Sequence, residues 1–157
     1  MAKNAAFLTG LALSGMAAAQ APVPIQPAYD YGIATPLPGR WTYAPTASGS
    51  AASFADVSAR PLLTLTCVRA TRRISIARPA AGASPYLMVW TSGERRNVPA
   101  SFNPATGLIT ADLPAYDRLF DSIAFSRGRI AVGPSNAGAL VAPLWPETIR
   151  VVEDCRV

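Results

Sequence analysis

The stretch LLTLTCVRATRRISIAR, residues 62–78, alternates apolar and polar side chains on both sides of a short break at Ala70-Thr71. An apolar residue at every second position is typical of a strand with one buried side. The residues that share the apolar side are Leu63, Leu65 and Cys67, followed by Ile74 and Ile76. We therefore predict a hairpin of two strands, Leu62–Arg69 and Arg72–Arg78, although Ala-Thr lacks the Gly or Asn that tight turns favour.

Outside this hairpin, similar short apolar segments predict five more strands and two helices. The strands are Tyr86–Thr91, Glu94–Val98, Leu108–Leu113, Gly128–Val132 and Ala139–Ala142, and the helices are Pro114–Ser126 and Trp145–Cys155. Asp117 suits the first turn of one helix, and Pro146 suits the first position of the other. Strands followed by a helix, a strand pair and a second helix predict an α+β domain, an antiparallel β-sheet or sandwich with two short helices.

The N-terminus has the pattern of a secretory signal peptide over residues 1–19. Lys3 provides a positive charge and Ala5–Ala19 an apolar stretch. Small residues fit a cleavage site after Ala19 and another after Ala21; we prefer the first, which leaves Gln20 as the first residue, because the second would place Pro22 directly after the cleaved bond. Residues 20–39 contain five prolines and little charge, which indicates an extended leader. We expect residues 40–157 to form a single domain, in the periplasm or secreted, with no transmembrane anchor after processing.

The chain contains two cysteines, Cys67 on the apolar side of a predicted strand and Cys155 on the apolar side of the last predicted helix. In an oxidising compartment this pair predicts a structural disulfide. The chain-entropy relation gives about 4.6 kcal/mol as an upper bound for its stabilisation. A metal site would need three or four ligands, and a redox pair would favour CxxC spacing, so both are disfavoured.

The charged residues exclude several kinds of chemistry. The chain has no His, and Lys3 is the only lysine, so the processed chain would carry 13 Arg against 9 Asp and Glu, a net charge of +4. A Ser-His-Asp triad, a Ser-Lys dyad, a Schiff base and an HExxH zinc site cannot be built from these residues. We expect no cofactor, no metal and no nucleic-acid partner.

Carboxylate pairs are the remaining candidates for catalysis. Asp117 and Asp121 are spaced i,i+4, and Glu153 and Asp154 are adjacent. A glycosidase needs two carboxylates across a cleft, whereas acids at a helix start are usually favourable partners of the helix dipole. We therefore expect a protein that is not an enzyme, with a small carboxylate-based hydrolase as the alternative.

Arginines form three short clusters at predicted strand ends or loops. The clusters are Arg72-Arg73, Arg95-Arg96 and Arg127-Gly128-Arg129. If the sheet brought them together, their guanidinium groups would form a patch for carboxylates or phosphates of a partner. Alternatively, they are solvated strand ends beside acids such as Glu94.

Several segments resemble small exported domains with two cysteines. Gly39-Arg40-Trp41, the strand ending at Cys67 and the final helix closing on Cys155 resemble the VasI-like family associated with type VI secretion. Asp117–Ile123 followed by Gly128–Val132 is similar to the periplasmic invasion-associated locus B proteins. These resemblances imply an envelope-accessory role without catalytic residues.

Together these observations predict an exported accessory or binding domain that acts through protein–protein contacts in the cell envelope. Its expected partner is another envelope protein or an anionic envelope glycan. A secreted inhibitor-like binder is a further alternative.

Overall fold

The computed structural model describes residues 30–157, so the predicted signal peptide and the first part of the leader lie outside the described residues. This part of the chain forms nine strands, one 3-10 turn and two α-helices. The strands are β1 (Gly39–Thr46), β2 (Gly49–Asp56), β3 (Pro61–Val68), β4 (Arg73–Pro79), β5 (Tyr86–Trp90), β6 (Arg95–Asn103), β7 (Leu108–Pro114), β8 (Arg129–Pro134) and β9 (Leu140–Pro143). The helices are α1 (Arg118–Ala124) and α2 (Pro146–Arg156), and the 3-10 turn is η1 (Arg69–Thr71).

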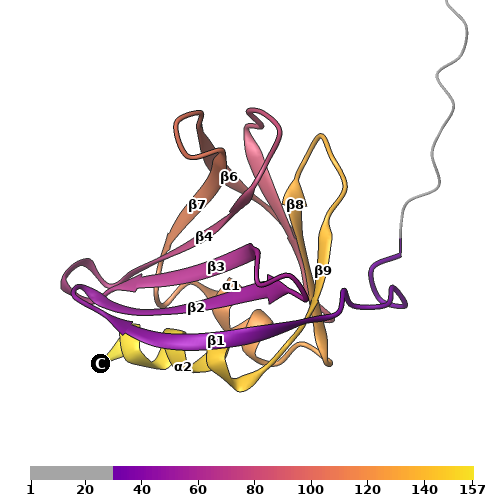
Figure 1. The fold of residues 1–157 in the computed structure, drawn as a ribbon. Coiled ribbons are helices and arrows are strands. Elements are labelled where there is room, and N and C mark those ends of the chain that lie inside the picture. Colours follow the sequence, from indigo (N-terminus) through magenta and orange to yellow (C-terminus); the bar gives the residue numbers. More distant parts are fainter. Residues whose placement is uncertain (1–29) are drawn as a thin grey trace, which may run out of the picture.

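All nine strands belong to one antiparallel sheet, in the order β1-β2-β3-β4-β7-β6-β5-β8-β9. The sheet twists and curls strongly, so β1–β3 cross the lower half of Figure 1 while β6–β9 rise steeply. Its two outer strands come together, because Leu37 N–H donates to Val141 C=O at 2.8 Å and Trp41 Nε1 to Pro143 C=O at 2.7 Å. Opposite parts of one curled sheet therefore face each other across the core.

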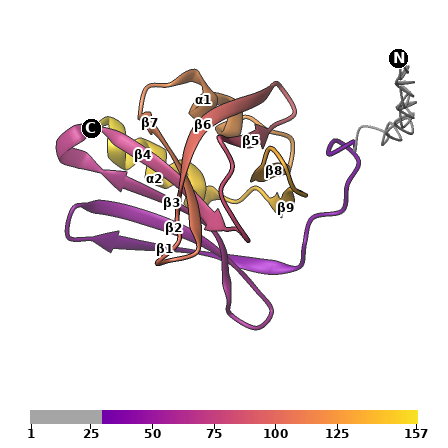
Figure 2. The same ribbon diagram turned by 90° about the horizontal axis from the view of Figure 1, so that it is seen from above.

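The core lies inside this curl, and the helices cover one side of it (Figure 2). Helix α2 packs on the inner face of β1–β4, and α1 contacts α2. Leu63, Leu65 and Cys67 are at most 1% exposed, while Thr64 and Thr66 lie on the other face, as the alternation predicts. The expected α+β architecture, an antiparallel sheet with two short helices, is confirmed.

The hairpin at the centre of the sequence forms with a slightly different turn. Its register pairs Val68 with Arg73, and the connection is the 3-10 turn η1. Arg72 ends this turn with φ 50°, in the left-handed region that glycine or asparagine occupies more easily. The missing Gly or Asn is therefore compensated by a longer turn.

Strands β1 and β2 were not among the predicted strands, and β6 extends to Asn103 rather than stopping at Val98. In β2, the buried Ala52 and Phe54 alternate with the small residues Ala51 and Ser53. Small side chains on both faces give little contrast in hydrophobicity, so the period of two is weak.

Cys67 and Cys155 form the predicted disulfide, with their Cα atoms 5.6 Å apart. Neither residue is exposed to solvent. The bond joins β3, in the first half of the sheet, to the last turn of α2. The final helix is therefore covalently fixed to the sheet.

The part of the leader that the structure describes packs on the outer face of the last strands. Ala34 is buried beside Ala131 and Val141. An Arg129 guanidinium N–H donates to the Ala34 carbonyl. Residues 30–38 thus cover β8 and β9 before the chain enters β1.

Candidate functional site

The three arginine clusters lie at the starts of β4, β6 and β8. Each of these strands is separated from the next by one antiparallel strand, so their starts lie at the same end of the ladder. Two hydrogen bonds link neighbouring segments along this end of the sheet: Arg72 C=O accepts from Ala115 N–H at 2.8 Å, and Arg127 N–H donates to Ser92 Oγ at 3.0 Å. Ala115 lies just before α1 and Ser92 just before β6. The structure therefore places the clusters along one rim.

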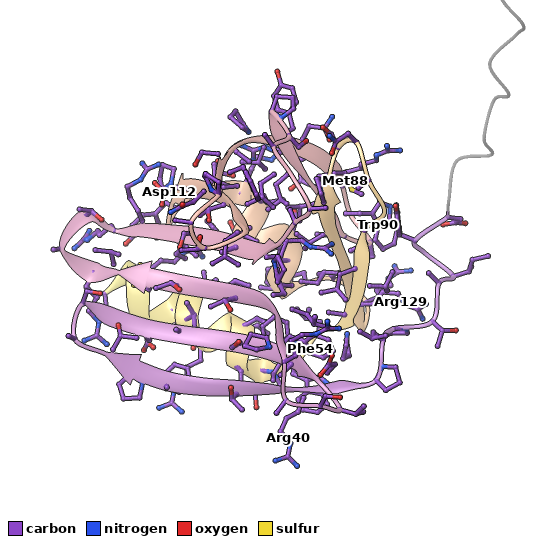
Figure 3. All side chains as sticks on the ribbon, turned by 45° about the horizontal axis from the view of Figure 1, so that its top comes forward. Arg40, Phe54, Met88, Trp90, Asp112 and Arg129 are labelled. Atoms are coloured by element: carbon purple, nitrogen blue, oxygen red, sulfur yellow. A yellow bond between two sulfur atoms is a disulfide. The ribbon has the colours of Figure 1, made fainter. Side chains whose placement is uncertain are left out.

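One arginine of each cluster is held by the fold. Arg73 pairs with Asp112 on the neighbouring strand, and Arg96 binds Asp117. Arg129, as described above, holds the segment that precedes β1. Figure 3 shows Asp112 and Arg129 well apart on the molecule, so these contacts do not form a common pocket.

The other arginine of each cluster is exposed. Ion pairs among residues 30–157 join carboxylates to Arg60, Arg69, Arg73, Arg96 and Arg156. Arg72, Arg95 and Arg127 have no carboxylate at ion-pair distance in this part of the chain, and all three are exposed. We call these three residues the arginine rim.

Asp117 caps α1 and binds Arg96 at the same time. Its Oδ1 accepts from Leu119 N–H at 2.9 Å, and its Oδ2 accepts from Arg96 Nη2 at 2.9 Å, while Arg96 Nη1 also contacts Oδ1. The hydrogen bond from Arg96, aided by the Leu119 amide, holds the pKa of Asp117 below its ordinary value. The capped carboxylate is thus kept ionised in a structural role.

The other candidate carboxylates have separate structural partners. Asp121 binds Arg156 at 2.7 Å, which joins α1 to the end of α2. Asp154 accepts from Tyr43 Oη at 2.6 Å, and this hydrogen bond lowers the pKa of Asp154. Asp117 and Asp121 lie near each other in sequence, but each is bound to a different arginine. This arrangement suits helix anchoring.

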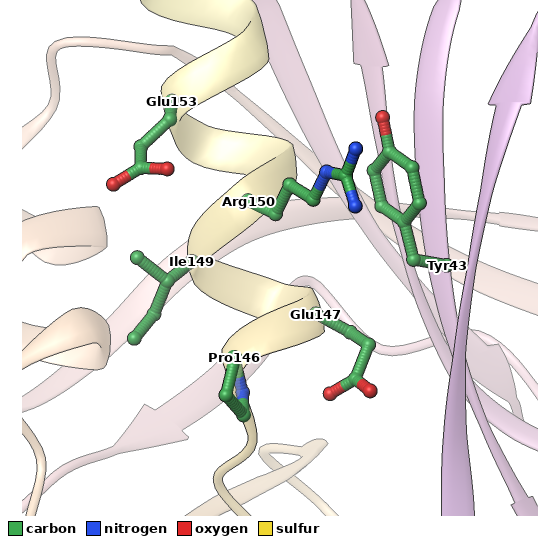
Figure 4. Close-up of a pocket in the computed structure, with 6 residues that line it drawn as sticks. All are labelled: Tyr43, Pro146, Glu147, Ile149, Arg150 and Glu153. Atoms are coloured by element: carbon green, nitrogen blue, oxygen red, sulfur yellow. The ribbon is translucent and has the colours of Figure 1, made fainter.

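A groove of about 650 Å³ lies between β1 and α2 (Figure 4). Its lining residues are Tyr43, Pro146, Glu147, Ile149, Arg150 and Glu153. The Arg150 guanidinium lies over the Tyr43 ring, 4.2 Å from its centre. The Oε2 atom of Glu147 is buried and has no hydrogen-bond partner among the described residues.

Sequence reasoning did not single out this groove. One signal was present, because Pro146, Ile149, Arg150 and Glu153 have the i, i+3, i+4, i+7 spacing of one helical stripe. Tyr43 lies on a strand that was itself missed. A helical stripe of mixed polar and charged residues is typical of the solvated face of a helix. The sequence therefore did not indicate a groove beside this stripe.

Within residues 30–157, no group of three or more His, Cys, Asp or Glu side chains is arranged to hold a metal ion. None of the helices there is long and apolar enough to cross a membrane.

No protein-family model, curated protein or solved structure matches this chain.

Proposed function

We propose that this protein is an exported, non-catalytic accessory domain that binds an acidic surface of another protein in the cell envelope. The observation that carries the proposal is the arginine rim. Arg72, Arg95 and Arg127 are exposed at successive strand starts, and no carboxylate of the described chain neutralises them. Such a row of cations attracts an acidic partner and orients it during encounter.

Three other observations support this proposal. A buried disulfide is typical of proteins that fold in the periplasm or after secretion. Asp117, Asp121 and Asp154, which a carboxylate-based hydrolase would use, are engaged in helix anchoring. The resemblance to small exported two-cysteine domains implies the same accessory role.

The structure determines which arginines of the clusters are suitable for a test. Replacing Arg96 would remove the ligand of the α1 cap, so a variant of Arg95 and Arg96 together would disturb folding as well as binding. Within residues 30–157, the guanidinium groups of Arg95 and Arg127 bind no carboxylate. The appropriate variant is therefore Arg95→Ala with Arg127→Ala.

The test is capture of envelope proteins on immobilised protein, repeated at increasing salt. The matched control is Arg40→Ala with Arg60→Ala, which removes the same charge at the other end of β1–β3. We expect the unchanged protein and the control variant to capture a partner protein in amounts that fall as salt rises. The rim variant should capture less of this partner, and its remaining capture should not depend on salt. Equal capture by both variants would overturn the proposal. Capture of an anionic glycan without protein would identify the glycan as the partner.

A further inference from the structure

Strand β1 is an outer strand of the sheet, and part of its outer edge has no neighbouring strand. Strand β1 pairs with β2 along its inner edge. It contacts β9 near its start, where Leu37 bonds to Val141 and Trp41 bonds to Pro143. No backbone hydrogen bond of the described chain continues that contact beyond Trp41. The second half of β1 is therefore an open edge.

The register of the β1–β2 hairpin identifies which groups this edge presents. Thr46 pairs with Gly49 around the two-residue loop Ala47-Ser48, so Thr46 exchanges hydrogen bonds with β2 and every second residue does the same. Tyr43 and Pro45 fall at the alternate positions, where backbone groups point away from β2. Pro45, which has no N–H, fits such a position. The open edge thus presents the Tyr43 N–H and C=O and the Pro45 C=O.

Helix α2 forms the wall opposite this edge. Figure 4 shows the Arg150 side chain reaching from the helix to the Tyr43 ring, while Ile149 and Glu153, which line the same groove, lie on the side of the helix away from that strand. A strand added beside β1 would extend the sheet, and its inward side chains would lie on the exposed side of α2. This combination of an open strand edge and an adjacent helix is suited to binding an extended peptide.

The charges in the groove favour a basic peptide. Glu147 and Glu153 contribute two carboxylates, and the single guanidinium, that of Arg150, already lies on the Tyr43 ring. Neither glutamate forms an ion pair within the described chain. The buried Glu147 Oε2 lacks a donor, and a buried carboxylate oxygen is stabilised when a cation or N–H reaches it.

We infer that the groove binds an extended segment of a partner protein, which adds as a strand to β1 and places a Lys or Arg side chain against Glu147. This inference concerns a different surface from the arginine rim and does not depend on it. The backbone bonds to Tyr43 and Pro45 would supply affinity, and the contact with Glu147 would select the sequence.

The probe is a labelled peptide, Thr-Val-Thr-Lys-Thr-Val-Thr, whose Val and Lys side chains share one face when it is extended. Two comparison peptides carry Glu in place of Lys, or N-methyl groups on alternate backbone amides. Binding is followed by fluorescence anisotropy with the full domain. Hydrogen exchange of the Tyr43 amide provides the site-specific measurement.

We expect the Lys peptide to bind and to slow exchange at the Tyr43 amide. Glu147→Gln should weaken binding about tenfold, whereas Glu153→Gln, the same change in a more exposed residue, should have a smaller effect. The Glu peptide and the N-methylated peptide should bind more weakly than the Lys peptide. The N-methylated peptide keeps this test independent of how well the Glu147 variant folds.

Three results would overturn the inference. The first is failure of the Lys peptide to bind, and the second is equally strong binding of the N-methylated peptide. The third is peptide binding that leaves hydrogen exchange at the Tyr43 amide unchanged. Sedimentation without peptide is measured first, because a dimer with a protected Tyr43 amide would identify a second copy of this chain as the occupant.

Discussion

At the scale of single residues, the contact between Arg96 and Asp117 links β6 to the start of α1. Asp117 lies six residues beyond Ala111, where the pairing of β7 with β6 ends, and its bond to Arg96 ties the helix start directly to the start of β6. The side chains are partly shielded, with 33% and 16% of their surface exposed. Their two hydrogen bonds hold the first turn of α1 over the core.

Replacing Arg96 with Ala should reduce the free energy of unfolding by about 1–2 kcal/mol, because Asp117 loses a charged partner but keeps its bond to Leu119. The matched control is Arg95→Ala, the exposed neighbour, which should change stability by about 0–0.5 kcal/mol. Urea unfolding at neutral pH measures both. Equal losses in the two variants would contradict this role for Arg96.

The pair of Arg96 and Asp117 also makes the free energy of unfolding depend on pH. The pKa of Asp117 is lower in the folded chain than its ordinary value of 3.8, so the stabilisation is complete above that value and is lost as pH falls through the folded pKa. In the Arg96→Ala variant the pKa of Asp117 should move back toward its ordinary value. The difference in stability between the two proteins should therefore shrink below about pH 4, as acid-range unfolding curves would record.

At the scale of whole elements, α2 is the segment whose position depends most on covalent chemistry. The Cys67–Cys155 bond fixes its last turn, while Asp121–Arg156 and Tyr43–Asp154 attach the same end. Replacing both cysteines with Ala should lower the free energy of unfolding by about 2–5 kcal/mol. Urea unfolding of the oxidised protein and the double variant measures this loss. A loss below about 1 kcal/mol would mean that the surrounding contacts alone hold α2.

The sequence was informative about elements where burial is one-sided. The hairpin around residues 62–78 and the disulfide follow from periodicity and cysteine placement, and the structure confirms them. Both predicted helices are present, but the first is shorter than the predicted Pro114–Ser126 and spans Arg118–Ala124, because Pro114 ends β7 and Asp117 caps the helix. The arginine clusters were identified, but their division into bound and exposed members depends on which strands become neighbours. The order of β4, β7 and β6 brings Arg73 to Asp112, and no local pattern specifies that order. The β1–α2 groove depends on such long-range placement too, and so could not be predicted.

At the scale of the whole molecule, the curled sheet is completed by a short contact between its outer strands. Trp41, 2% exposed, supplies one of the two bonds there, through Nε1 to Pro143 C=O. Trp41→Phe keeps most of the buried ring and removes this donor, so the partly buried Pro143 carbonyl loses its bond to Trp41. We expect a loss of about 1–3 kcal/mol and faster hydrogen exchange in β9. Unchanged exchange of the Val141 and Ala142 amides would show that the contact does not govern this edge.

The export that the N-terminal sequence predicts is also tested on the whole chain. N-terminal sequencing of protein recovered from the periplasm or medium should give a first residue at Gln20 or close to it, because the charged start, the apolar stretch and the small residues that follow agree on a signal peptide. Mature protein that still begins at Met1 and stays in the cytoplasm would contradict the prediction.

The positions of the two cysteines, in β3 and α2, also determine at what stage of synthesis the disulfide can form. The two cysteines are 88 positions apart, and strands β4–β9 and helix α1 all lie between them in the sequence. Cys155 follows Cys67 by these 88 positions, so the native bond cannot close until the segment up to Cys155 has been synthesised. Cys67 must therefore wait as a reactive thiol until the rest of the domain has arrived. A truncated chain that stops before α2 would keep this thiol and remain open to other oxidised partners, whereas a complete chain buries it.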